Sequence, residues 1–273
     1  MDDAHRIYRE LVLREFWPEI RVGLNLAFYR TYCVPRIARL LLGTGELTGR
    51  PLKRAYDTGV IMYELIAHGV DHPRGRQVLS ALNRMHRAHD ISDADYRYVL
   101  GTLVFIPTRW VDRYGPRPLT AAQRAATLGF YTRVGAAMGI PAIPATWEQF
   151  EAEFEEYERD NFAYDPAAAE LLSSTKDLMV QRLPKPLRRF GFVQRMTAAS
   201  LDAMLDQRAR TALGRSEPGR LPRMIVHIGL RCRARLRRLR PVPVVDQWEP
   251  GRANAAYPGG YTLDQIGPSG TGR

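Results

Sequence analysis

The chain has 273 residues, of which 45% are hydrophobic, 25% charged and 10% aromatic. This balance is typical of a folded globular protein and excludes a disordered or collagen-like chain. The two cysteines, Cys33 and Cys232, lie far apart, which excludes a disulfide framework and a cysteine-rich zinc site. The formal net charge is +11, and residues 181–240 account for it, with 16 Arg and Lys against three acids.

The hydropathy pattern predicts no membrane-spanning segment. No run of about 18 uncharged apolar residues occurs, and residues 1–21 carry charges throughout, which does not fit a secretory signal. We therefore expect a cytoplasmic protein, with peripheral contact at a membrane as an open alternative.

Helical periodicity dominates the chain and predicts an all-α fold. In chain order we expect helices over 5–20 and 23–30, with a break near Pro18, and then over 35–42, 51–68 and 75–89. Ser92 is the expected N-cap of a helix that carries Phe105 and has to end or kink at Pro107.

The second half of the chain shows two capping-box signals. Thr120 with Gln123 predicts a helix to about residue 138, and Thr146 with Gln149 predicts one over 148–162. Further helices are expected from 166, over 186–212 and over 221–239. We expect one multi-helix domain over 1–240, followed by an extended Pro/Gly-rich tail over 241–273.

Two consecutive predicted helices carry unusual polar residues. In the first, Arg54, Asp57 and Thr58 have offsets of 0, 3 and 4, which places them on one helix face. A solvated ion pair on a surface helix explains this pattern equally well.

In the second helix, His86 and His89 continue an apolar stripe that begins at Leu79. A buried neutral histidine needs partners for both ring nitrogens. Asn83 lies one turn before His86 and is a candidate partner for one nitrogen, while the other nitrogen either finds a partner in the core or ligates a metal or haem iron. A zinc site of His68, His72, His86 and His89 is a further alternative, although their spacing fits no zinc motif.

Several motifs in order resemble one family. They are FYRTYCVPRIARLL (Phe28–Leu42), RAYDT (Arg54–Thr58), NRMH (Asn83–His86), ISDADYRYVLGTLVFIPTRW (Ile91–Trp110), RYGPRPLT (Arg113–Thr120), MGIPAIP (Met138–Pro144), EEYE (Glu155–Glu158) and LPKPLRR (Leu183–Arg189). Together they resemble the MpaB family of oxygenases and the related latex clearing proteins, which are rubber oxygenases. The likeness extends over roughly residues 20–240 and is nearer to the fungal MpaB-like branch.

The resemblance implies a globin-like helical core around a haem b cavity. It implies His86 as the iron ligand, Asn83 beside it in the cofactor site, and Arg54 and Thr58 on the distal side. Asp57 stands where the rubber oxygenases have a lysine, and it is the third catalytic candidate. The implied partners are dioxygen and a small hydrophobic substrate, isoprenoid-like, whose carbon–carbon double bond is oxidised or cleaved.

Two further features leave alternatives open. Phe105, Trp110, Phe130 and Tyr131 are available to line a hydrophobic channel, but ordinary core packing explains them too. The basic helix over 221–239 fits a docked helix with a solvated basic face, an interfacial helix on anionic lipid, or a phosphate-binding surface. Nucleic acid is the least supported partner, because no DNA-binding motif occurs. The rival functions are a non-enzymatic basic protein that binds membranes or nucleic acid, and an enzyme with a non-haem metal.

Overall fold

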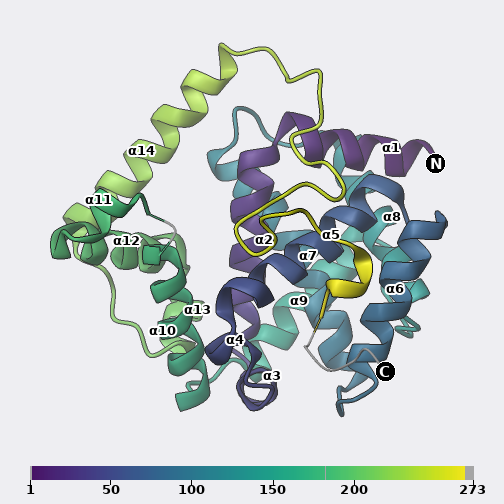
Figure 1. Cartoon of the computed structure of the whole chain (residues 1–273), viewed down its shortest axis with the longest axis horizontal. Helices are drawn as coiled ribbons and strands as arrows, with labels where there is room; N and C mark the ends of the chain where they lie inside the picture. The colour runs from purple at the N-terminus through teal and green to yellow at the C-terminus, as the bar shows by residue number, and fades with distance from the viewer. Residues whose placement is uncertain (1, 182, 268–273) are drawn as a thin grey trace. The chain divides into compact units, whose positions relative to one another are not determined.

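The computed structural model describes residues 2–181 and 183–267, without the side chains of residues 185 and 187. These residues form helices and no β-strand, so the all-α prediction is confirmed. The α-helices are α1 (Asp3–Glu10), α2 (Trp17–Thr31), α3 (Pro35–Gly43), α4 (Glu46–Gly49), α5 (Pro51–His68), α6 (Pro73–His86), α7 (Asp93–Tyr114), α8 (Ala121–Ala137), α9 (Trp147–Asn161), α10 (Pro166–Gln181), α11 (Lys185–Arg188), α12 (Gly191–Met204), α13 (Gln207–Ala212) and α14 (Arg220–Arg238). A π-helical turn, η1 (Leu11–Glu15), precedes α2, and a 3-10 turn, η2 (Leu263–Gln265), lies near the end of the chain (Figure 1).

The chain groups into two compact units. Unit 1 consists of residues 1–27, 52–155 and 241–273, and unit 2 of residues 28–51 and 156–240. Unit 1 contains α5, α6, α7 and α8, and therefore all of the candidate site residues. The globin-like core around a cofactor cavity and the domain boundary at residue 240 stay predictions.

Two helix boundaries in unit 1 follow the local capping signals. The Ser92 side chain accepts a hydrogen bond from the Asp95 amide, at 3.1 Å, and begins α7. Thr120 and Gln123 form the complete capping box at the start of α8. Both of these predictions are confirmed.

Of the two expectations at Pro107, the end of a helix is wrong, because α7 continues through this residue to Tyr114, and a kink stays a prediction. The proline removes one backbone donor, but Phe105 and Val111 on either side of it are fully buried. Gly23 of α2 packs directly on Pro107, where a Cβ would lie 2.4 Å from the proline Cα. Tertiary packing on both sides of the proline thus holds the helix together.

Other boundaries differ from the predictions by a few residues. The first break falls at Phe16, just before Pro18, where the π-helical turn meets α2. Helix α6 ends at His86, so His89 lies beyond it and is exposed. The region 186–212 is divided among α11, α12 and α13.

Unit 2 is organised around buried ion pairs. Arg30 donates to both oxygens of Glu158, one of them at 2.6 Å, and also pairs with Asp206. Asp202 of α12 accepts from Lys176 at 2.9 Å and from Arg215 at 3.0 Å. In this unit α12 packs against both α10 and α14.

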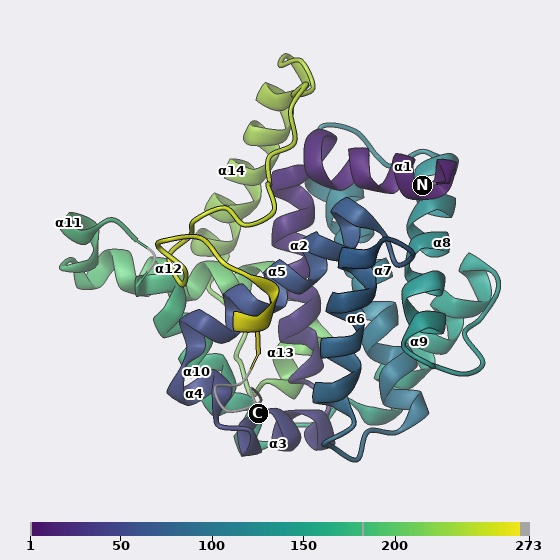
Figure 2. The ribbon, with the colours of Figure 1, turned by 45° about the vertical axis from the view of Figure 1, so that its right-hand side comes forward.

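The C-terminal segment, which we define as residues 241–267, packs within unit 1. Figures 1 and 2 show it in yellow, lying along α5. Asp246 accepts from Arg14 at 2.7 Å and also pairs with Arg9. The Trp248 ring lies 5.8 Å from the Tyr63 ring of α5. Tyr257 and Tyr261 are buried, so this segment contributes side chains to the core of its unit.

Candidate functional site

Helix α5 presents two side-chain pairs, each one turn apart. The Arg54 guanidinium donates to the Thr58 hydroxyl, which in turn donates to the Arg54 carbonyl at 3.0 Å. Lys53 Nζ donates to Asp57 Oδ2 at 2.7 Å. The two pairs lie in adjacent rows of the helix, about 100° apart. The structure thus brings Arg54 and Thr58 together, and it gives Asp57 a lysine as its partner.

Asp57 accepts hydrogen bonds from its own helix and from the C-terminal segment. Its carboxylate is 4% exposed and accepts hydrogen bonds from the Tyr257 hydroxyl and from the Gly267 amide, the latter at 3.1 Å. Lys53 also donates to the Gln265 carbonyl at 3.1 Å and to the Gly267 carbonyl at 2.8 Å. These donors satisfy the buried carboxylate and fix it in position.

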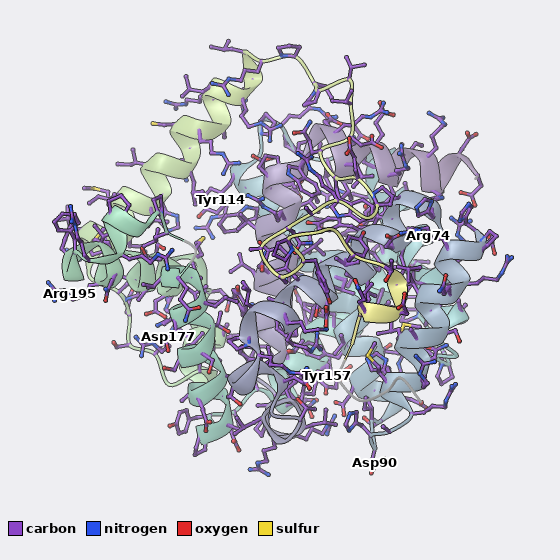
Figure 3. All side chains as sticks on the ribbon, viewed as in Figure 1. Arg74, Asp90, Tyr114, Tyr157, Asp177 and Arg195 are labelled. Atoms are coloured by element: carbon purple, nitrogen blue, oxygen red, sulfur yellow. The ribbon has the colours of Figure 1, made fainter. Side chains whose placement is uncertain are left out.

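A second buried acid on α5 repeats this arrangement. Glu64 is fully buried and accepts two hydrogen bonds from Arg74, each 2.7 Å long. Arg74, labelled in Figure 3, lies in the first turn of α6, so the pair links the end of α5 to the next helix. The Tyr261 hydroxyl donates to Glu64 at 2.8 Å. Two tyrosines of the C-terminal segment therefore reach the two buried acids of one helix.

Lys53, Tyr257 and Tyr261 were not among the predicted site residues. The C-terminal segment gave no helical or strand period, and its Gly and Pro content is typical of a solvated tail. The available signal was the pair of tyrosines four residues apart in a segment rich in Gly and Pro.

His86 is the last residue of α6 and is half-buried. Its Nδ1 atom is buried and has no hydrogen-bond partner among the described residues. The Tyr96 ring packs edge-on against the imidazole, with the ring centres 5.6 Å apart. Burial lowers the pKa of His86 to about 4, with further contributions from the positive charges of Arg54 and His89. At neutral pH the imidazole is therefore uncharged, and a ring nitrogen has a lone pair available for a ligand.

One electrostatic interaction links the two helices of the candidate site. The charge of Arg54, on α5, acts on the imidazole of His86, on α6. Asn83 is directed elsewhere, because its amide donates to the Ala137 carbonyl at the end of α8, at 3.3 Å. The charge of Arg54 thus helps to lower the pKa of His86, while the Asn83 amide donates to the last turn of α8.

Two of the other histidines, His68 and His72, lie where α5 ends and α6 begins, and the His68 Nε2 atom is also buried without a hydrogen-bond partner in the part of the chain that the structure describes. The His68 and His72 rings stack with their centres 4.8 Å apart, and His72 caps α6 by accepting from the Arg74 amide. Within residues 2–181 and 183–267, no three His, Cys, Asp or Glu side chains gather into a metal-binding group. The alternative of a four-histidine zinc site is therefore wrong for the part of the chain that the structure describes.

The four aromatic residues considered as channel lining are buried in unit 1 and pack on other side chains. Phe105 contacts the rings of Trp147 and Phe150 at centre distances of 5.0 and 5.2 Å. The Tyr131 hydroxyl accepts from Tyr8 at 2.9 Å. These contacts are those of an ordinary core, and the channel stays a prediction.

The observations on His86 fit a residue that would hold haem iron. A neutral imidazole with an unpartnered buried nitrogen is the side chain that such a bond needs. Arg54 adds a positive charge of the kind that pairs with a carboxylate such as a haem propionate.

Comparison with known proteins identifies one family. Residues 9–238 match the family described as "ER-bound oxygenase mpaB/B'/Rubber oxygenase, catalytic domain". The chain is 25% identical over 231 residues to the ER-bound oxygenase mpaB' of Penicillium brevicompactum, an alignment that covers 78% of the chain and 53% of that relative. It is also 25% identical over 232 residues to the ER-bound oxygenase mpaB of Penicillium roqueforti, covering 78% of the chain and 75% of the relative. The chain thus spans about half the length of the first of these proteins and three quarters of the second.

Proposed function

The chain belongs to the family of oxygenase catalytic domains that includes the ER-bound oxygenases mpaB and mpaB' and the rubber oxygenases, and from this membership we propose its activity. We propose that it is an oxygenase that uses haem b and dioxygen to oxidise or cleave a carbon–carbon double bond. The proposed substrate is hydrophobic and isoprenoid-like. Rubber, which the family description names, is a polymer with such double bonds.

The haem part of the proposal depends on one observation, the uncharged imidazole of His86 with its buried, unpartnered nitrogen. In this proposal His86 would hold the iron. A bound haem supplies the activation of dioxygen, and the protein supplies binding, orientation and the exclusion of water. The edge-on contact with Tyr96 fixes the plane of the imidazole.

Arg54 and Thr58 have supporting roles in this proposal. The Thr58 hydroxyl holds the Arg54 guanidinium in one position, from which it binds a propionate or another oxygen-bearing group. By the resemblance, Asp57 stands where the rubber oxygenases have a lysine, and Lys53, Tyr257 and Gly267 hold its carboxylate. We assign Asp57 the role of positioning α5 rather than that of binding iron.

The proposal also includes the localisation of the protein at a membrane surface. Both relatives are named ER-bound, and a substrate rich in carbon–carbon double bonds dissolves in lipid rather than in water. No helix among the described residues has the length and hydropathy needed to cross a bilayer. We therefore propose a peripheral contact, and the basic helix α14 is its candidate. The rival function, a basic protein without catalysis, is not supported by a match to a catalytic domain over most of the chain.

The visible spectrum of protein purified from haem-replete cells tests the proposal. We expect a Soret band, a pyridine haemochrome of the b type, and carbonyl products when squalene is supplied with dioxygen. Protein with bound iron but no haemochrome would contradict the haem part of the proposal. Protein with haem that leaves isoprenoid alkenes unchanged would contradict the substrate part.

A further inference from the structure

Helix α14 exposes its apolar side and turns a different side to its neighbour. The helix packs against α12. Its buried or half-buried positions include Val226, Leu230 and Ala234. The large apolar side chains on the other side are exposed: Leu221 by 62%, Met224, Ile225, Ile228, Leu236 by 61%, and Leu239 by 83%.

These six residues form one continuous strip, which we call the apolar stripe. At 100° per residue they fall within about 120° of the helix circumference, with Met224 and Leu236 at its two edges. Cys232, which is also exposed, lies near the middle of the stripe. One sequence-based interpretation was a docked helix that exposes only its basic face. In the structure the apolar stripe is exposed as well.

Arginines border the apolar stripe along the C-terminal half of the helix. Arg231 and Arg238 follow one edge, Arg233 and Arg240 follow the other, and Arg235 projects between them. No Asp or Glu occurs between Arg220 and Arg240. An apolar strip with cationic borders matches the layering of an anionic bilayer surface, where acyl chains lie directly below phosphate groups.

We propose that the apolar stripe of α14 inserts into the surface of an anionic membrane, with its bordering arginines at the level of the lipid phosphates. Charge complementarity selects this partner. A nucleic acid would leave the stripe exposed to water, whereas an apolar protein groove would leave the arginines without anions. The proposal deepens the membrane part of the proposed function and does not depend on haem. It also gives a route by which an oxygenase reaches a substrate dissolved in lipid.

Cys232 provides a direct probe of this contact. Cys33 is fully buried, and burial raises the pKa of its thiol well above the usual range, so a thiol reagent labels Cys232 selectively. We expect an environment-sensitive dye on Cys232 to shift its emission to the blue when vesicles of phosphatidylcholine and phosphatidylserine are added. We expect a much smaller shift with phosphatidylcholine alone. Unchanged emission with both kinds of vesicle would overturn the proposal.

Co-sedimentation of the unlabelled full chain with the same vesicles tests the stripe itself. We expect Ile225→Glu with Ile228→Glu to lower the bound fraction by about tenfold or more, since two carboxylates then face the acyl chains. Binding unchanged in this double variant would contradict the proposal. Circular dichroism checks that the variant keeps its helices, because neither side chain is buried.

A charge-matched pair of variants tests the arginines. We expect Arg231→Gln, Arg235→Gln and Arg240→Gln together to remove most of the preference for phosphatidylserine. The control removes three exposed positive charges elsewhere, with Arg195→Gln, Arg208→Gln and Arg252→Gln. If both triple variants bind equally well, net charge alone attracts the protein and the assignment to α14 is wrong. A normal Soret band in a protein that does not bind vesicles would leave the oxygenase proposal intact and contradict only this one.

Discussion

The phenol of Tyr257 donates a hydrogen bond to the carboxylate of Asp57, a residue 200 positions earlier in the chain. The contact joins the C-terminal segment to the helix that carries Arg54 and Thr58. Gly267 adds a backbone donor to the same carboxylate. The C-terminal segment lies beyond residue 238, where the family match ends, and it nevertheless completes the surroundings of a candidate site residue.

Removal of this phenol is expected to destabilise unit 1. Tyr257→Phe leaves a buried, charged carboxylate with one donor fewer, at a cost of about 1–3 kcal/mol in the free energy of unfolding. Urea denaturation measures the difference. Tyr164→Phe is the control, because Tyr164 is 58% exposed and its loss of a hydroxyl should be neutral. Equal stability of the two variants would show that the Tyr257 contact contributes nothing.

The close approach of α2 to α7 leads to a second prediction, on the stability of glycine variants. A Cβ at Gly23 would lie 2.4 Å from the Cα of Pro107, so Gly23→Ala has to push the two helices apart, at a cost of about 1–3 kcal/mol. Gly129 is the matched control, since it lies within α8 and a Cβ there meets nothing within 4 Å. Gly129→Ala should raise stability by about 0.5–1 kcal/mol through helix propensity. Thermal unfolding that moves both variants in the same direction would contradict the packing described here.

The buried His5 predicts a pH dependence of stability. Its ring lies 2.8 Å from the Ile66 carbonyl, and burial lowers its pKa below the ordinary value of 6.5 despite this contact. The His5 side chain of the unfolded chain therefore binds a proton as the pH falls through 6.5, while that of the folded chain binds it only at lower pH. The free energy of unfolding should fall from pH 7 to pH 5 more steeply in the native protein than in His5→Gln. Parallel curves from urea titrations would show that His5 is not the group responsible.

Local signals explain what the sequence predicted well. Helix α8 begins at Thr120 because a capping box involves residues only three positions apart, and α5 ends before Gly69 because that residue has a φ of +82°. A side chain at Gly69 would also meet the ring of His5, with a Cβ 2.7 Å from its nearest atom. The spacing within α5 and α6 and the family resemblance made Arg54, Asp57, Thr58 and His86 candidates, and their roles stay predictions.

What the sequence could not show depends on contacts between distant residues. The helical spacing put Asp57 on one face with Arg54, yet the carboxylate pairs with Lys53 because Tyr257 and Gly267 arrive on that side. The helical period of residues 221–239 contained no information on which side of α14 faces α12. The sequence predicted that a helix ends or kinks at Pro107, and the continuation of α7 depends on the packing of Gly23 against this proline, which propensities do not include.

The most direct test of the central claim is chemical rescue at His86. Replacement of His86 by Gly should abolish the Soret band of the purified protein, and added imidazole should restore it by occupying the vacated space. His89→Gly is the matched control, because His89 is exposed beyond the end of α6, and it should keep the native spectrum. A Soret band that persists unchanged in His86→Gly would contradict the assignment of this residue as the iron ligand.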